Sequence, residues 1–351
     1  MNSWRDNVRK VEPYTPGEQP KEEGVIKLNT NENPYPPSDK IKKAMSGIKN
    51  LRKYPDPAAT KLVEAIASYH GFDKEEVFVG VGSDDVLAVA FMTFFNGKKP
   101  IFFPDITYSF YPVWAELFGI PYEKKAVNDA FEIQKEDYYA ENGGGVFPNP
   151  NAPTGAFLSL EVVEDIIQHN QDVVVIVDEA YIDFGGDTAK ELTRKYDNVL
   201  VVQTYSKSRS LAGLRIGYAI GNKELIKAMN DVKYSYNSYT MNEPSIVLGT
   251  AVLEDEEYFQ ETRNKIIDTR EWFQIEMRKI GFSFADSKAN FIFATHESVP
   301  AKEIFEAAKK AKIYVRYFDQ PRINNYLRIT IGTRDEMETL LDFLKEFTAT
   351  K

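Results

Sequence analysis

Residues 172–177 read DVVVIV and are followed at once by DEAY at 178–181. A continuous run of β-branched residues is typical of a strand that is buried on both faces in a parallel sheet. Further apolar runs at 200–203 and 216–220 lie among segments with helical periodicity. Strands that alternate with helices predict an α/β domain with a mainly parallel sheet.

The pattern changes in the C-terminal third of the chain. Helical periodicity runs from about residue 244 to 280, with a break or bend inside it. Short strand patterns then alternate with helical ones, the strands at 282–284, 291–293, 313–317 and 327–331 and the helices at 301–311 and 335–347. We therefore predict an N-terminal arm over 1–40 that packs with the small domain, a large domain over 41–241 and a small α+β domain over 242–351.

Composition narrows the possible functions. The 351 residues carry a formal net charge of -10, which disfavours nucleic acid as the main partner because phosphates need a basic face. The chain has no cysteine, and its three histidines have no metal-ligand spacing, so we expect no metal site. No apolar run is long enough to cross a bilayer and no signal-peptide core is present, so we expect no membrane contact and a cytoplasmic location.

Lys207 lies in the string TYSKSR at 204–209, directly after the predicted strand at 200–203. A lysine at the carboxyl end of a strand lies where ligands bind in open α/β sheets. Arg215 follows closely, and Ser206 and Arg215 are suited to hold a phosphate, the arginine in bidentate fashion. A solvated surface lysine would explain the Ser-Lys pair alone equally well.

Asp178 ends the most apolar predicted strand of the chain. A carboxylate there is costly unless it is paired, and a cationic ring nitrogen would be a suitable partner. Tyr181 follows on the same turn and could donate a hydrogen bond to a hydroxyl group on the ring of a bound cofactor. The alternative is that Asp178 only caps the turn that follows it.

Two turns that contain glycine or proline are further candidate parts of a binding site. The string GVGSDD at 80–85 begins a predicted helix at 83–96, with Ser83 as candidate N-cap, and the start of a helix favours an anion. The string NPNAPTG at 149–155 forms a turn that would aim a polar side chain rigidly. An ordinary loop-to-helix junction and a structural turn are the alternatives. Neither a dinucleotide nor a P-loop motif is present.

A reactive lysine, a buried acid and a phosphate cradle are what pyridoxal phosphate requires of a protein. The order and spacing of the motifs resemble fold-type I pyridoxal-phosphate-dependent aminotransferases, and among them the histidinol-phosphate aminotransferase family. The resemblance covers nearly the whole chain. It rests on NTNENPY at 29–35, YPD at 54–56, GSDD at 82–85, PNAPTG at 150–155, DEAY at 178–181, SKSRSLAGLR at 206–215 and LRITIG at 327–332. It implies a large domain with a mainly parallel seven-stranded sheet and a smaller α+β C-terminal domain.

The resemblance also implies residue roles. Lys207 would carry the cofactor and move the substrate α-proton, with Asp178 at the ring nitrogen and Tyr181 at the ring hydroxyl. Tyr54 would reach the cofactor of the other subunit, which makes the active unit a homodimer. The implied cofactor-binding set is Lys207, Asp178, Tyr181, Tyr108, Asn151, Gly82, Ser83, Asp84, Thr204, Ser206, Arg215 and Tyr54. The implied substrate-binding set is Tyr14, Asn31, Arg316 and Arg328.

The chain departs from the family pattern in one turn that matters. Relatives commonly have Asn-Asn-Pro-Thr-Gly, whereas this chain has Asn151-Ala152 before the proline. The asparagine that usually contacts the ring hydroxyl is then replaced by Ala152, and Asn151 is the candidate to take over its role.

The family resemblance implies exchange of an amino group between L-histidinol phosphate and 2-oxoglutarate. A threonine-phosphate decarboxylase-like lyase shares most of these motifs, and an aromatic-amino-acid aminotransferase is a nearer variant. A binding protein on the same scaffold is a third possibility, although it would have no need for Lys207.

Overall fold

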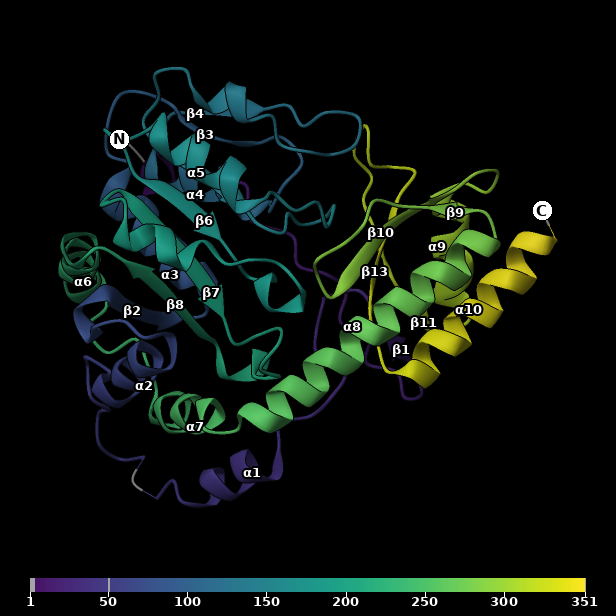
Figure 1. The fold of residues 1–351 in the computed structure, drawn as a ribbon, viewed down its shortest axis with the longest axis horizontal. Helices are drawn as coiled ribbons and strands as arrows, with labels where there is room; N and C mark the ends of the chain where they lie inside the picture. The colour runs from purple at the N-terminus through teal and green to yellow at the C-terminus, as the bar shows by residue number, and fades with distance from the viewer. Residues whose placement is uncertain (1–3, 50, 351) are drawn as a thin grey trace.

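The computed structural model describes residues 4–49 and 51–350. Its large domain is built on a seven-stranded sheet with the strand order β2-β8-β7-β6-β5-β3-β4 (Figure 1). The strands are β2 (Val77–Val81), β3 (Ile101–Pro104), β4 (Tyr122–Lys125), β5 (Gly145–Pro148), β6 (Val175–Asp178), β7 (Val199–Thr204) and β8 (Ile216–Gly221). β8 runs antiparallel to both β7 and β2, and the other pairs are parallel, so the predicted mainly parallel sheet is confirmed.

Strand β6 occupies the middle of this sheet, and all four of its residues are buried. It pairs in parallel with β5 and β7, as the β-branched run predicted. The strand begins at Val175, later than predicted, because a turn precedes it in which the Val173 backbone N–H donates to the Asn170 carbonyl. The acid at its carboxyl end, Asp178, is therefore presented at the edge of a buried sheet.

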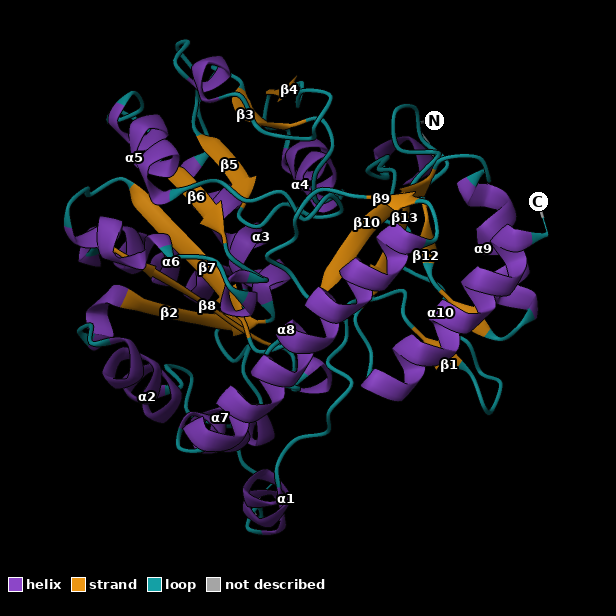
Figure 2. Cartoon of the chain, turned by 45° about the vertical axis from the view of Figure 1, so that its right-hand side comes forward, coloured by secondary structure: helices purple, strands orange, loops and turns teal. Residues whose placement is uncertain are grey.

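Helices cover both faces of the sheet (Figure 2). They are α2 (Thr60–His70), α3 (Ser83–Phe94), α4 (Phe110–Phe118), α5 (Leu160–Gln168), α6 (Lys223–Tyr236) and α7 (Glu243–Leu253), whereas α1 (Asp39–Ser46) lies beyond α7, away from the sheet. The prediction of Ser83 as N-cap is wrong: the N-cap of α3 is Gly82, and Ser83 is the first helical residue. Gly82 has φ of 83°, a conformation that glycine adopts without strain.

The small domain packs α8 (Glu256–Lys279), α9 (Ala301–Lys310) and α10 (Arg334–Ala349) against a second sheet. That sheet has the order β12-β13-β10-β9, with β9 (Phe282–Ser283), β10 (Phe291–His296), β12 (Arg316–Tyr317) and β13 (Leu327–Thr330). The predicted break in the long helical run lies between α7 and α8, at Glu254 and Asp255.

The N-terminal segment reaches the small domain through a short parallel pair, β1 (Ile26–Lys27) with β11 (Ile313–Tyr314). Helix α7 lies beside α1 and α2, and its Ile246 and Val252 share an apolar cluster with Leu62. The domain boundaries at 40 and 241 stay predictions. Short 3-10 turns are η1 (Trp4–Asn7), η2 (Lys74–Glu76), η3 (Lys135–Tyr138), η4 (Ile182–Phe184), η5 (Ala189–Arg194) and η6 (Ala212–Leu214).

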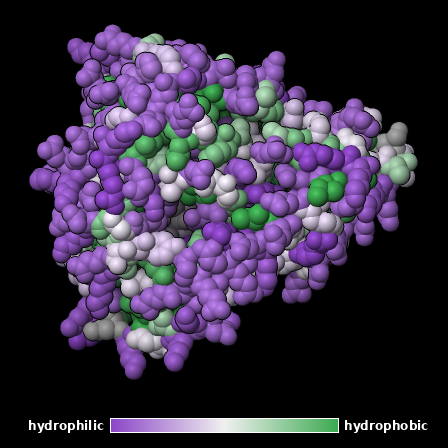
Figure 3. Space-filling view, in the orientation of Figure 1, coloured by the Kyte–Doolittle hydropathy of each residue, from purple (hydrophilic) through white to green (hydrophobic). Residues whose placement is uncertain are grey.

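Hydrophilic side chains cover most of the face seen in Figure 3, and hydrophobic ones show between them in scattered groups. Of the helices in the described part of the chain, none combines the length and apolar character that a membrane span requires.

Strand β8 approaches the turn between β2 and α3 closely enough that only glycine fits at position 217. A Cβ there would lie 2.3 Å from the Gly82 carbonyl carbon and 2.3 Å from the Ser83 nitrogen. We predict that Gly217→Ala lowers the free energy of unfolding by about 1–3 kcal/mol, because backbone must move to accept the methyl group. Urea denaturation measures this. Gly213→Ala is the matched control, since its Cβ would meet no described atom within 4 Å; equal stability of the two variants would contradict the prediction.

Candidate active site

A cavity of about 170 Å³ lies where the N-terminal segment, the large domain and the small domain meet. Lys207 lines it, just beyond the end of β7. Its Nζ donates to the Thr30 carbonyl at 3.2 Å and lies 5.6 Å from the centre of the Tyr181 ring. The structure brings seven of the predicted residues to this cavity, namely Tyr14, Asn31, Tyr108, Tyr181, Lys207, Arg316 and Arg328.

Asp178 is buried, with 4% of its surface exposed. Its Oδ2 accepts a hydrogen bond from the Tyr111 hydroxyl at 2.8 Å, and its Oδ1 accepts one from the Ala180 backbone N–H at 3.3 Å. Burial raises the pKa of this carboxyl to about 6, although both hydrogen bonds oppose the rise. No ion pair to Asp178 exists among the described residues. The carboxylate thus caps its turn, as one alternative held, and also lacks the cation that would stabilise its charge.

Tyr181 is held by a chain of hydrogen bonds from the N-terminal segment. Asn31 donates through Nδ2 to the Tyr181 hydroxyl at 2.9 Å. Its Oδ1 accepts from the Thr330 hydroxyl at 2.9 Å, and its backbone N–H donates to the same hydroxyl oxygen at 3.0 Å. Asn31 has φ of 57°, a left-handed conformation that asparagine tolerates better than most residues. It therefore ties Tyr181 of the large domain to β13 of the small domain.

An anion cradle forms where β2 and β7 end and the antiparallel β8 begins. Arg215 donates from Nη1 to the Ser206 hydroxyl at 3.3 Å and from Nη2 to Asp84 Oδ2 at 3.2 Å. The Thr204 hydroxyl donates to the Ser206 hydroxyl oxygen at 3.0 Å. A Cβ on Gly82 would lie 2.4 Å from Arg215 Nη2, so only glycine leaves room for the guanidinium. With Ser83 and Asp84 in the first turn of α3, the site offers a cation, hydroxyls and free helix N–H groups.

Tyr108 connects this cradle to the cavity. Its hydroxyl donates to Asp84 Oδ1 at 2.7 Å, and burial raises the pKa of the phenol above its usual range. Tyr14, from the N-terminal segment, stacks on Phe110 with ring centres 4.3 Å apart, and its ring lies 6.4 Å from that of Tyr108. Two tyrosines far apart in sequence thus form one wall.

Two arginines face each other across a strand pair. Arg316 on β12 and Arg328 on β13 are direct partners in the antiparallel register, and both line the cavity. Arg328 donates from Nη2 to the Asn29 carbonyl at 2.9 Å, but its buried Nε has no hydrogen-bond partner in the described structure. Burial also lowers the pKa of the Arg328 guanidinium. Like charges directly opposite each other are destabilising, so the arrangement is suited to an anion that lies between them.

Asn151 and Tyr54 do not line this cavity. Both donors of the Asn151 amide are used, by the Ile106 carbonyl at 2.9 Å and the Thr154 hydroxyl at 3.0 Å, whereas Ala152 lines the cavity. The side chain of Asn151 therefore joins its own turn to the one that contains Ile106. Tyr54 is 82% exposed, and its nearest ring is Tyr239 at 4.8 Å.

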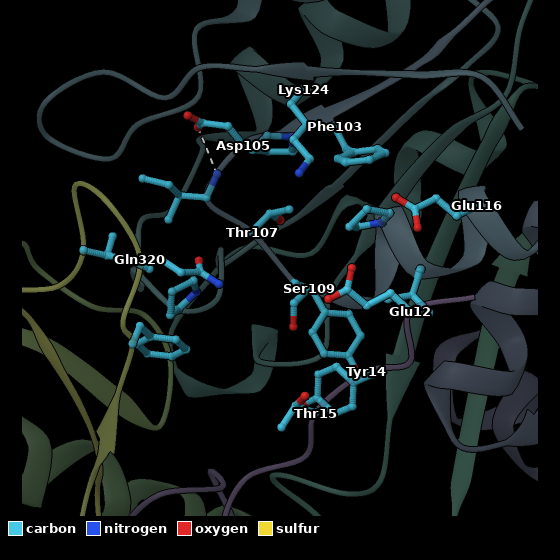
Figure 4. Close-up of a pocket in the computed structure, with 18 of the residues that line it drawn as sticks. Glu12, Tyr14, Thr15, Phe103, Asp105, Thr107, Ser109, Glu116, Lys124 and Gln320 are labelled. Carbon is cyan, nitrogen blue, oxygen red and sulfur yellow. Dashed lines mark hydrogen bonds between the residues drawn. The ribbon is translucent and has the colours of Figure 1, made fainter. Parts of the chain in front are cut away.

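A larger cavity of about 410 Å³ adjoins the first and shares Tyr14, Tyr108 and Arg316 with it. In Figure 4 Glu12 and Glu116 lie on one side of it and Gln320 on the other. Three of the predicted residues thus line both cavities.

Sequence reasoning missed Tyr111, the hydroxyl partner of Asp178. A signal was available, because the short apolar run at 100–103 is followed by an aromatic segment with helical periodicity, which would begin near the carboxyl edge of a parallel sheet. Asn29 and Thr30 contact Arg328 and Lys207 through their backbone carbonyls. Every residue has a carbonyl, so the residue types at 29 and 30 could not indicate these contacts.

Comparison with known proteins gives the chain a family. Residues 23–344 match the family model of aminotransferase class I and II. The histidinol-phosphate aminotransferase of Clostridium beijerinckii is 51% identical over 344 residues, covering 97% of this chain and 96% of that protein.

Two solved structures share the fold. The histidinol-phosphate aminotransferase of Sinorhizobium meliloti in complex with pyridoxal-5'-phosphate superposes with a TM-score of 0.84 at 21% identity, covering 93% and 91% of the two chains. The L-threonine-O-3-phosphate decarboxylase of Porphyromonas gingivalis gives 0.78 at 18% identity, covering 93% and 100%. These two likenesses concern the fold alone. The family match and the identity to the Clostridium protein show that the chain belongs to the class I and II aminotransferases and, among them, to the histidinol-phosphate aminotransferase family.

Proposed function

We propose that the protein transfers an amino group between L-histidinol phosphate and 2-oxoglutarate with pyridoxal phosphate as cofactor. The observation that carries the proposal is the position of Lys207 in one cavity with the opposed arginines Arg316 and Arg328. A lysine amine can bind the cofactor, and the arginines can bind the anionic end of a substrate. The name of the Clostridium relative, at about half identity over nearly the whole chain, supports the same reaction.

The residues present fit the cofactor. Asp178 is a buried carboxylate without a cation, which a protonated ring nitrogen would provide. Ser206 and Arg215 offer donors that a phosphate needs, and Gly82 has no side chain to crowd the guanidinium. When bound, pyridoxal phosphate supplies a ring that accepts the electron pair left when the substrate carbon loses its proton. Ala152 contributes no polar group, so Tyr181, which accepts a hydrogen bond from Asn31, would be the residue at the ring hydroxyl.

Different side chains of the protein then have different roles in the reaction. Lys207 Nζ would take the α-proton of the amino donor in the first half of the reaction, and would give a proton to the α-carbon of the new amino acid in the second half. Arg316 and Arg328 hold the phosphate of the first substrate and a carboxylate of the second, since a guanidinium binds both in bidentate geometry. Tyr14 and Tyr108 cover the cavity and limit the access of water.

A homodimer is part of the proposal. Tyr54 is too exposed to serve its own subunit, and Tyr236 and Tyr239 are exposed as well, at 70% and 47%. Exposed aromatic side chains that lie near one another favour burial in a subunit interface. Tyr54 would then contact the cofactor bound by the other subunit. The cytoplasmic location stays a prediction of the sequence.

Neither alternative reaction gains support from the site. The decarboxylase fold is shared, but the close relative is an aminotransferase by name. An aromatic amino acid would present a carboxylate in place of a phosphate, and no feature of the cavity favours that substrate over the phosphorylated amine.

A single-turnover assay tests the proposed reaction. We predict that enzyme loaded with pyridoxal phosphate, mixed with L-histidinol phosphate and no keto acid, converts its cofactor to the amine form in one equivalent, and that 2-oxoglutarate reverses the change. Absorbance spectra of the cofactor follow both half-reactions. No conversion by L-histidinol phosphate, together with release of carbon dioxide from O-phosphothreonine, would instead identify a lyase.

The buried carboxyl gives a second prediction, on stability. Its folded-state pKa of about 6 lies above the usual 3.8, so the folded state holds the proton more tightly and its stability falls as pH rises between these values. Without cofactor, Asp178→Asn should therefore be more stable than the wild type by about 3 kcal/mol at pH 7.5, and by less than about 1 kcal/mol at pH 4.

Bound cofactor should reverse this order at pH 7.5, because the charged carboxylate then has a cationic partner. Thermal unfolding of both proteins, with and without pyridoxal phosphate, measures the four values. A variant that is less stable than the wild type without cofactor at pH 7.5 would contradict the account of Asp178.

A further inference from the structure

Arg322 reaches from the small domain to the large one. It lies in the loop between β12 and β13. Its Nη1 donates to Asp105 Oδ2 at 2.8 Å, and its Nη2 donates to the carbonyls of Val127 and Asn128 at 2.7 and 3.2 Å. One guanidinium thus donates hydrogen bonds to three acceptors that lie on two loops of the large domain. The ion pair is partly exposed, so the geometry of the three bonds matters more than the charge attraction alone.

Asp105 is the first residue of a turn that leads into the cavity. Its Oδ1 accepts hydrogen bonds from the backbone N–H groups of Ile106 at 2.9 Å and Val127 at 3.0 Å. Thr107 and Tyr108 follow and line both cavities. Whatever holds Asp105 therefore also fixes the direction in which Tyr108 enters the site.

Two unusual backbone conformations meet at this contact. Arg322 has φ of 70°, and Phe131 of the large domain has φ of 63°. The Phe131 ring packs against Phe293 and Tyr326 of the small domain, with ring centres 5.5 and 5.1 Å apart. Non-glycine residues keep such conformations only where surrounding contacts over-determine them. Each domain thus holds a strained residue whose side chain is bound by the other.

We propose that Arg322 is a positioning residue that fastens the Asp105–Tyr108 turn to the small-domain loop and so holds two walls of the larger cavity together. Asp105 lines that cavity from the large domain and Gln320 lines it from the small domain (Figure 4). Ile106 and Ile323 line it beside them. Without the three hydrogen bonds these walls separate, and Tyr108 and Arg316 lose their fixed spacing. The inference rests on the proposed function only for its effect on substrates.

The first test needs no substrate. In the enzyme loaded with pyridoxal phosphate, Arg322→Gln should speed hydrogen exchange of the Ile106 and Val127 amides by about tenfold, the size expected when a charge-assisted hydrogen bond is lost. Exchange in β6 should not change. Arg278→Gln is the matched control, because it breaks an ion pair with Asp286 that stays inside the small domain. Unchanged exchange at Ile106 and Val127 in Arg322→Gln would overturn the proposal.

Two further substitutions separate the side chain from the backbone. Arg322→Gly relieves the strained φ but removes the guanidinium, so it should exchange as fast as Arg322→Gln. Arg322→Lys keeps a charge near Asp105 but cannot supply the fork that reaches two carbonyls, so its exchange should be intermediate. Slow, wild-type exchange in Arg322→Gly would show that the backbone rather than the guanidinium holds the turn, and would also overturn the proposal.

Kinetics complete the test. We expect Arg322→Gln to raise the KM of both substrates by about tenfold and to leave kcat within about twofold, because the residue positions a wall and touches no reacting atom. A fall in kcat at unchanged KM would contradict a positioning role. If the wild type fails to convert L-histidinol phosphate, the proposed function fails, whereas the exchange result still decides whether Arg322 fastens the turn.

Discussion

The burial of the Asp178 carboxylate at the carboxyl end of β6 is the constraint on which the site depends. A buried acid without a cation is unfavourable, and its pKa of about 6 expresses that cost. The sheet keeps it there because β6 is paired on both sides and fully buried. Tyr111 and the Ala180 backbone N–H hold its two oxygens in place. The fold thus presents a fixed negative charge that a cationic ring can neutralise.

The other functional groups are arranged around that charge by the same edge of the sheet. β7 ends just before Lys207, and the turn after β2 presents Gly82 beside Arg215. The small domain and the N-terminal segment then add what the sheet cannot, an opposed arginine pair and the bridge from Asn31 to Tyr181. Because these parts come from three regions of the chain, the spacing between them depends on contacts such as that of Arg322 with Asp105.

Much of the fold could be predicted from residue patterns. The β-branched run before Asp178 identified the central strand, and the break before α8 followed from periodicity. Strand β4 was missed because its residues, YEKK, form a polar sheet edge without apolar alternation, and β2 because VFVGV is short and contains glycine. Ser83 was wrongly given the N-cap because local preference favours serine, whereas the close approach of Arg215 requires glycine at 82.

The site could be predicted only where a residue lies next to a strand end or in a recognised motif. Lys207 lies in the cavity, with Asp178 at the carboxyl end of the neighbouring strand. The opposition of Arg316 and Arg328 could not be foreseen, because strand register depends on tertiary packing. For the same reason the role of Asn151 in joining two turns was hidden: its acceptor, the Ile106 carbonyl, lies 45 residues away.

The most direct test of the account is to identify the residue that carries the cofactor. Enzyme loaded with pyridoxal phosphate would be reduced with borohydride and digested, and the peptides weighed by mass spectrometry. The account predicts one added cofactor mass, on the peptide that contains Lys207, and none in Lys207→Ala. Attachment to another lysine, such as the buried Lys233, would contradict it.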